Sequence, residues 1–166
     1  MVSGISIRLA TPTDGGPIAH IYNHYVAHSI VTFDEDPVTE SEMARRLDEA
    51  QRDGWPWLVA AEGESVVGYA YGAAWRPRPG YRFSAEVTVY LAPDRGGEGI
   101  GSRLYRELIP RLQGRGVHSL MAGIALPNDA SVALHKKCGF KKVAHFEQAG
   151  VKFDRWIDVG YWQRLL

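Results

Sequence analysis

A cluster of glycines stands between an alternating apolar segment and a helical pattern, in the run VYLAPDRGGEGIGSRLYREL (residues 89–108). A strand, a glycine-rich turn and a helix start present free backbone N–H groups at the positive end of a helix dipole, which suits an anion such as pyrophosphate. Two common phosphate motifs do not fit, because the Walker loop needs a lysine at the position of Ser102 and the dinucleotide motif needs a glycine there. On these residues alone, a turn without a ligand is an equal alternative.

Two titratable side chains near the glycines could move protons. Glu86 alternates with Thr88 and Tyr90 along the strand that leads to the glycines, and His135 lies near the end of a later short helix. Taken alone, Glu86 is an ordinary strand carboxylate paired with an arginine, and a lone helical histidine is usually structural or solvated. The remaining histidines show no ligand cluster and no metal spacing, so no metal is predicted; they are His20, His24, His28, His118 and His145.

Hydrophobic periodicity predicts the elements that must position these residues. The predicted strands cover residues 5–10, two apolar runs within 55–75 around the turn EGES, 82–92, 116–126 and 155–166. The predicted helices cover residues 11–28, a segment from Thr39 to near Gly54, 100–112 and 128–140. This order favours an α/β (α+β) fold with helices on a mixed sheet, whose front half is antiparallel and whose middle contains a parallel β-α-β crossover.

Several single residues predict where the helices begin, end or bend. Thr39 and Glu42 form a capping-box pattern at the start of the second helix. Asn128 or Asp129 is expected to cap the last helix, which ends near Gly139. Pro110 lies well inside the third helical pattern, so a kink or a shorter helix is expected there.

The composition fits one globular domain over residues 1–166, with 45% hydrophobic residues and no linker or internal repeat. The 19 basic and 19 acidic residues balance, so no overall field attracts nucleic acid or a membrane surface. The single cysteine, Cys138, excludes an intrachain disulfide, and the first residues lack the features of a signal peptide. A cytoplasmic protein is therefore expected.

The glycine segment resembles the acetyl-CoA loop of the GNAT superfamily of N-acetyltransferases, which reads Gln/Arg-x-x-Gly-x-Gly/Ala. Gly99 and Gly101 match its small positions, but Gly96 stands where the family has Gln or Arg, with Arg95 one residue early. A second family motif, Asn-x-x-Ser-x-x-Leu/Met-His/Tyr-x-x-x-Gly-Phe/Tyr, is matched by Asn128, Ser131, His135, Gly139 and Phe140. Within the superfamily, residues 5–163 are similar to phosphinothricin N-acetyltransferases and methionine sulfoximine acetyltransferases, in segments such as IYNHY, TFDEDP, PWLVA and RWIDVGYWQ.

This resemblance implies a GNAT fold, a central mixed sheet of about six to seven strands with flanking helices, and acetyl-CoA as cosubstrate. It implies that backbone N–H groups of the loop bind pyrophosphate, with the residues Gly96, Gly97, Glu98, Gly99, Ile100 and Gly101. It also implies an oxyanion donor on the main chain of Val89, Tyr90 and Leu91, and contacts to the pantetheine arm from Asn128 and Ser131. Arg95, Arg103, Lys136 and Lys137 are weaker candidates for the phosphates.

Acetyl transfer to an amine needs a base for the ammonium and a proton for the departing thiolate. By resemblance Glu86 is the general base, acting directly or through water, and His135 relays the amine proton or protonates the thiolate. Cys138 is not at a nucleophile position, so direct transfer in a ternary complex is expected.

For the acceptor, arginines before Glu86 suit forked recognition of a carboxylate or phosphinate. The resemblance places the amino acid between this loop and the TF segment, which makes Phe33, Arg78 and Tyr81 the candidate substrate residues. Arg76 and Arg82 are expected on a basic surface loop. Trp75, Trp156 and Trp162 are expected in the core or in a dimer interface.

The predicted function is acetylation of the α-amine of a small amino-acid analogue, of the phosphinothricin, methionine sulfoximine or methionine sulfone type. One alternative is a GNAT enzyme for another amine, such as a polyamine, an aminoglycoside or a protein N-terminus; the arginine loop argues against such cationic or large acceptors. Another alternative is a CoA-binding sensor without catalysis. The resemblance further suggests a homodimer, with no nucleic-acid or membrane partner.

Overall fold

One mixed sheet of seven strands runs through residues 4–166, the part of the chain that the computed structural model describes. The strands are β1 (Ile5–Leu9), β2 (Trp57–Glu62), β3 (Ser65–Ala74), β4 (Ser84–Leu91), β5 (Ser119–Leu126), β6 (Lys141–Lys152) and β7 (Arg155–Leu165). They lie in the order β1-β2-β3-β4-β5-β7-β6, and only the β4–β5 pair is parallel. The mixed sheet predicted from the sequence is confirmed, including the hairpin around residues 62–65.

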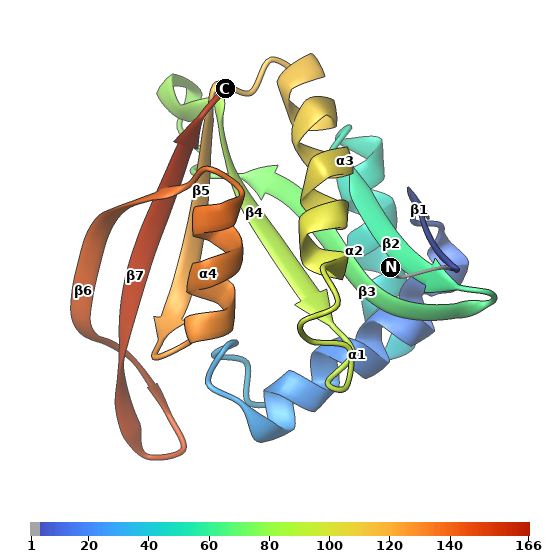
Figure 1. Ribbon diagram of the computed structural model, residues 1–166, viewed down its shortest axis with the longest axis horizontal. Coiled ribbons are helices and arrows are strands. Elements are labelled where there is room, and N and C mark those ends of the chain that lie inside the picture. The colour runs from blue at the N-terminus through green and yellow to red at the C-terminus, as the bar shows by residue number, and fades with distance from the viewer. Residues whose placement is uncertain (1–3) are drawn as a thin grey trace.

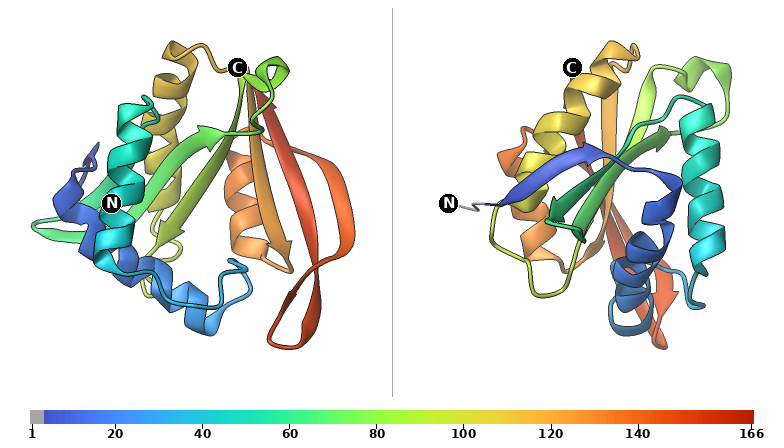
Figure 2. Two further views of the ribbon diagram at one scale, coloured as in Figure 1. Left: turned by 180° about the vertical axis from the view of Figure 1, so that it is seen from behind. Right: turned by 90° about the vertical axis from the view of Figure 1, so that its right-hand side faces the viewer.

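Two pairs of helices cover opposite faces of this sheet. The helices are α1 (Gly15–His28), α2 (Glu40–Arg52), α3 (Ile100–Gly114) and α4 (Asp129–Lys137), with short 3₁₀ turns η1 (Pro12–Asp14) and η2 (Pro79–Tyr81). Helices α3 and α4 lie in front of the sheet in Figure 1, whereas α1 and α2 lie behind it (Figure 2). The chain therefore has two hydrophobic cores, one on each face.

The alternation of β4 divides its side chains between these two cores. Val87 and Val89 pack with α3 residues such as Leu104, while Tyr90 packs with α1 and α2 residues such as Leu47. Glu86, being an even-numbered residue like Tyr90, lies on the α1–α2 face.

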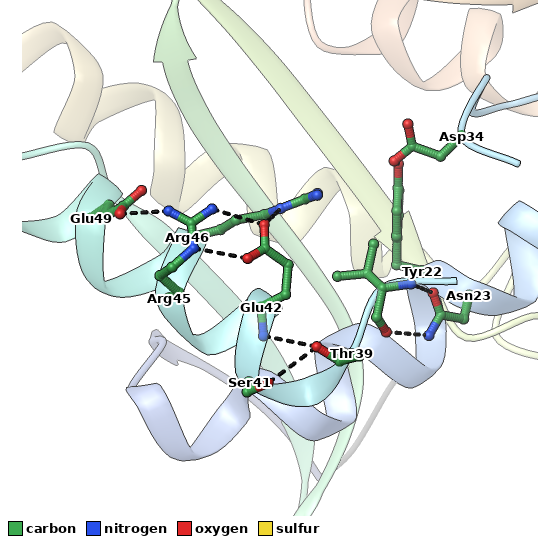
Figure 3. A network of polar contacts seen from close by, with 10 residues as sticks. Tyr22, Asn23, Asp34, Thr39, Ser41, Glu42, Arg45, Arg46 and Glu49 are labelled. Atoms are coloured by element: carbon green, nitrogen blue, oxygen red, sulfur yellow. Dashed lines mark hydrogen bonds and ion pairs between the residues drawn. The ribbon is translucent and has the colours of Figure 1, made fainter. Parts of the chain in front are cut away.

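Helix α2 begins where its capping pattern predicts. The Thr39 hydroxyl accepts a hydrogen bond from the Glu42 N–H at 3.1 Å, which satisfies one of the free donors of the first turn (Figure 3). The Glu42 carboxylate pairs with Arg45 and Arg46 on the same helix. At the other end of the chain, Asn128 caps α4 by accepting from the Ser131 N–H at 3.1 Å.

Strands β4 and β5 pair over only three residues each. Their register joins Ser84–Glu86 to Ser119–Met121, although both strands continue for five more residues. Figure 1 shows the two strands diverging beyond this point, toward the ends that carry the glycine loop and α4. The sheet is thus open along the last part of β4.

Two features of the structure depart from the sequence prediction. Strand β6 was not predicted, because most of its side chains are exposed on the sheet edge and show no apolar alternation. A kink or a shorter helix was expected at Pro110; the shortening does not occur, since the helix continues to Gly114. Pro110 lies on the exposed side of the helix, where water can solvate the Arg106 carbonyl that loses its N–H partner.

Candidate active site

The glycine loop leads directly into the first turn of α3. Gly97 has a φ of 82° and Gly99, the N-cap residue, has a φ of 79°, a left-handed conformation that favours glycine. A Cβ at Gly96, Gly97 or Gly99 would meet no atom within 4 Å, so open space surrounds this side of the loop. No side chain caps α3. Its N-terminal N–H groups are therefore available to an anion.

A cavity of about 580 Å³ connects this loop to the gap between β4 and β5. Its walls come from the end of β4, the glycine loop, the start of α3, β5 and α4. The predicted cofactor residues that line it are Val89, Tyr90, Leu91, Gly96, Gly97, Gly99, Ile100, Gly101, Asn128 and Ser131. Glu98 is not in the lining; it turns toward Arg95 instead.

The backbone of β4 points unpaired groups into this gap. The N–H groups of a strand alternate in direction, and Ala92 donates its N–H to the Val67 carbonyl of β3 at 2.9 Å. The Tyr90 N–H therefore points toward β3 as well. The N–H groups of Val89 and Leu91 point the other way, toward β5, and lie beyond the last β4–β5 pair. The Leu91 carbonyl accepts the Tyr25 hydroxyl at 2.6 Å. Of the three predicted oxyanion donors, two face the opening.

Glu86 lies at the point where β4 and β5 begin to separate. Its side chain is half-buried, and burial raises the pKa of the carboxyl above the usual range of a glutamate, while the charge of Arg76 opposes this shift. Tyr71 and Tyr161 lie close enough for the Glu86 charge to raise their pKa values, to which burial contributes most. Among residues 4–166, no side chain forms an ion pair with Glu86.

His135 lies on the other face of the sheet, packed against Tyr105 and Phe140. Its Nδ1 donates to the Ser131 carbonyl at 2.7 Å, and its Nε2 accepts the Tyr105 hydroxyl at 2.9 Å. The residue is 3% exposed, and burial lowers the pKa of the imidazole, which keeps the ring neutral. His135 lines the cavity, whereas Glu86 lies on the opposite face of the sheet and is not among the residues that line it.

The cationic candidates around the loop differ in their availability. Arg95 forms ion pairs with Glu62 and Glu98, each at 2.9 Å, and Arg103 donates to the Ile5 carbonyl at 2.7 Å. Lys137 lines the cavity, whereas Lys136 is exposed outside the lining. Lys137 is thus the predicted cation best placed for an anion in the cavity.

The three candidate substrate residues do not come together within one chain. Phe33 lies in the loop between α1 and α2, where its ring contacts Gly150 of β6. Arg78 and Tyr81 belong to the exposed η2 segment before β4. These two segments lie at opposite ends of the sheet in both Figure 1 and Figure 2. Of the tryptophans, Trp162 is buried and Trp156 is exposed.

Residues from α1 and the loop after it also contribute to the cavity, and the sequence analysis did not find them. Tyr25 and Val31 line it, and the Tyr90 hydroxyl donates to the Val31 carbonyl at 3.3 Å. Tyr25 belongs to the apolar face of its helix, so its pattern indicated core packing only. The contact to Leu91 depends on how α1 crosses β4, which a local pattern does not contain.

Residues 4–166 hold neither a metal-binding cluster nor a membrane-spanning helix. No group of three or more His, Cys, Asp or Glu side chains in this range is arranged to hold a metal ion. In the same range, every helix is too short or too polar to span a bilayer.

Comparison with known proteins identifies several relatives over nearly the full length. The family model described as "Acetyltransferase (GNAT) domain" matches residues 7–160. Phosphinothricin N-acetyltransferase of Streptomyces coelicolor is 39% identical over 166 residues, covering 98% of this chain and 96% of the relative. The L-methionine sulfoximine/L-methionine sulfone acetyltransferase of Salmonella typhimurium is 36% identical, covering 96% and 93%. The solved structure of YncA from Salmonella typhimurium with its cofactor acetyl-CoA has a TM-score of 0.96 at 36% identity, covering 99% and 95%.

Proposed function

The chain belongs to the GNAT family of N-acetyltransferases, and on this premise we propose that it acetylates the α-amine of a small amino acid. The proposed acceptors are of the phosphinothricin, methionine sulfoximine or methionine sulfone type, as in the relatives named above. The observation that carries the proposal is the gap between β4 and β5, which starts at Glu86 and leads to the glycine loop.

The residues around this gap fit acetyl-CoA, which supplies a thioester as acyl donor. The N-terminal N–H groups of α3 and the loop around Gly99 hold the pyrophosphate, with Lys137 adding a positive charge nearby. The N–H groups of Val89 and Leu91 donate to the negative charge that develops on a carbonyl oxygen during acyl transfer. Asn128 uses its side-chain oxygen for the α4 cap, which leaves its amide nitrogen for the cosubstrate.

We assign the general base to Glu86. A free amino acid reaches the enzyme mostly as an ammonium ion, which must lose a proton before it attacks. The Glu86 carboxylate accepts this proton directly or through water, and its raised pKa makes it a stronger base than an exposed glutamate.

For His135 we propose a supporting role in place of proton transfer. Both ring nitrogens are hydrogen-bonded, and the ring joins α4 to Tyr105 of α3. It therefore holds in place the helix that forms one wall of the cavity.

The proposal is tested by release of free CoA thiol from acetyl-CoA with separate acceptors. We expect saturable turnover with phosphinothricin, methionine sulfoximine and methionine sulfone, and none with spermidine or a generic peptide. Turnover with only spermidine or the peptide would mean that the acceptor is another amine and not an amino-acid analogue. Acetyl-CoA binding by calorimetry without transfer to any acceptor would favour a non-catalytic CoA-binding protein. The homodimer stays a prediction, which sedimentation velocity tests.

A further inference from the structure

Lys152 is a buried lysine that the proposed reaction does not use. It is the last residue of β6 and is paired with Arg155 of β7 across a tight turn. Only 1% of it is exposed, although lysine side chains almost always reach water. Such a burial is costly unless the ammonium is well bonded, so its partners indicate what it does.

The partners of Lys152 come from a distant part of the chain. Its Nζ donates to the Thr32 carbonyl at 2.7 Å and to the Tyr25 carbonyl at 3.3 Å, contacts that span 120 and 127 residues of sequence. Among residues 4–166, no carboxylate forms an ion pair with it. The Tyr25 carbonyl lies in the last turn of α1, where the negative end of the helix dipole stabilises a cation. The ring of Phe153 adds a cation–π contact at 5.2 Å.

Lys152 thereby fixes the start of the α1–α2 loop, residues 29–34. The same loop is held on its other sides: Tyr22 bonds the Thr32 hydroxyl at 2.7 Å, and Tyr90 bonds the Val31 carbonyl. Figure 3 shows Tyr22 rising from α1 toward Asp34, to which it donates at 2.6 Å. The loop therefore rests on α1, on β4 and on the tip of the β6–β7 hairpin.

This loop covers the open end of the β4–β5 gap. Val31 lines the cavity directly, and Tyr25 reaches from the helix before it to the Leu91 carbonyl. Phe33 lies on Gly150, two residues before Lys152 on the same strand. The hairpin tip thus holds the loop by one polar and one apolar contact.

We propose that Lys152 is a positioning residue that fixes the α1–α2 loop over the β4–β5 gap and so shapes the acceptor site. The proposal rests on the function proposed above. It explains why a cation is buried at the tip of an otherwise exposed edge hairpin, where a hydrophobic residue would fill the space but make no hydrogen bond to the loop.

The test compares Lys152→Met, which keeps an unbranched side chain one atom shorter and removes the charge, with Lys141→Met on the exposed part of β6. We expect the acceptor KM of Lys152→Met to rise at least about fivefold, with kcat changed less and acetyl-CoA affinity within about twofold of wild type. Amide hydrogens of residues 29–34 should exchange at least about tenfold faster, while those of α3 stay unchanged. Lys141→Met should match wild type in all of these measurements.

Unchanged exchange in residues 29–34 of Lys152→Met, or an unchanged acceptor KM, would overturn the proposal. If Lys152→Met does not fold, Gly150→Ala tests whether the hairpin tip positions the loop. Its Cβ would lie 2.5 Å from the Phe33 ring and must displace it, while Lys152 stays in place. A rise in acceptor KM then supports the hairpin contact, and an unchanged KM overturns it. If wild type acetylates no acceptor, the proposed function fails, and hydrogen exchange alone decides the role of Lys152.

Discussion

The region around β4 and the glycine loop differs from α4 in how its polar groups are bonded. In the first region, Glu86 has no ion-pair partner among residues 4–166, and no side chain caps α3 at Gly99. In the second region, Asn128 caps the helix and His135 uses both ring nitrogens in hydrogen bonds. Both regions border the same gap in the sheet, but both ring nitrogens of His135 are already hydrogen-bonded, whereas the Glu86 carboxylate has no ion-pair partner among residues 4–166.

The two titratable groups show what this difference means for chemistry. Burial shifts the pKa values of Glu86 and of His135, in each case against the charged form. A proton acceptor also needs a free lone pair, and the Nε2 lone pair of His135 already accepts the Tyr105 hydroxyl. Burial of a titratable residue is therefore not sufficient to identify a base; its remaining bonding capacity must be counted as well.

The largest expected effect comes from removing the Glu86 carboxylate, the proposed base. Glu86→Gln keeps the size of the side chain but cannot accept a proton, so we predict a loss in kcat of about 100-fold or more. Acetyl-CoA affinity should stay within about twofold of wild type, as measured by calorimetry. The exposed residue Glu147 of β6 provides the control, since Glu147→Gln should retain full turnover. Turnover of Glu86→Gln at the wild-type rate across pH would remove Glu86 as the base.

The second prediction concerns the open N-terminus of α3. Gly99→Ala places a Cβ on a left-handed residue, which costs about 1–2 kcal/mol of strain and shifts the N–H groups of the loop. We predict a loss of acetyl-CoA affinity of about tenfold, or ~1.4 kcal/mol, measured by calorimetry.

A matched control lies in the β2–β3 turn. Gly63 also has a positive φ, of 60°, and a Cβ there would meet no atom within 4 Å. Gly63→Ala should thus suffer similar strain without loss of acetyl-CoA affinity. Equal affinities for the two variants would show that the Gly99 turn does not hold the cosubstrate.

Local sequence patterns were sufficient to predict elements that depend only on residues close by in the chain. The Thr39 cap, the hairpin around residues 62–65 and the glycine turn before α3 follow from neighbouring residues. Strand β6 was missed because an edge strand with exposed side chains on both faces has no hydrophobic period. The shortening expected at Pro110 does not occur, because the cost of a proline depends on whether water reaches the freed carbonyl, which only the tertiary structure decides.

For the candidate site, the sequence predicted which residues lie near the gap but not which partners they have. Arg95 was a weaker candidate for the phosphates, and its guanidinium forms ion pairs with Glu62 and Glu98 instead. The family resemblance gave Glu86 and His135 roles in one reaction, while Glu86 lies on the α1–α2 face of the sheet and His135 lies on α4, where it lines the cavity. Lys152 carries no local signal at all, because its acceptors lie more than a hundred residues away.

The third prediction disturbs the fully bonded region. Tyr105→Phe removes the hydroxyl that donates to His135, which leaves a buried ring nitrogen without a donor. We predict a loss in the free energy of unfolding of about 1–2 kcal/mol, measured by urea denaturation. Turnover of the folded variant should fall by less than about threefold, because the proposed role of His135 is structural. A fall of about 100-fold at unchanged stability would instead assign proton transfer to this pair.

The smallest expected effect is a shift in the pH profile caused by Arg76. Burial raises the pKa of Glu86 and the charge of Arg76 lowers it, so Arg76→Gln leaves burial unopposed and raises this pKa further. Glu86 must be deprotonated to act as the base, so kcat/KM rises as pH increases through its pKa. The acidic limb of the kcat/KM profile should therefore move to higher pH, with no change on the plateau.

Arg82→Gln is the matched control for this shift, since Arg82 lies in the same loop but bonds the Pro79 carbonyl and stacks on Phe83. Its acidic limb should coincide with that of wild type. An equal displacement in both variants would reflect the general charge of the loop and not the particular effect of the Arg76 charge on Glu86. A limb that stays in place in Arg76→Gln would mean that a group other than Glu86 titrates there. Because the plateau rate is unaffected, this measurement reports the pKa of the base alone. Glu86→Gln removes the base itself and cannot separate the two.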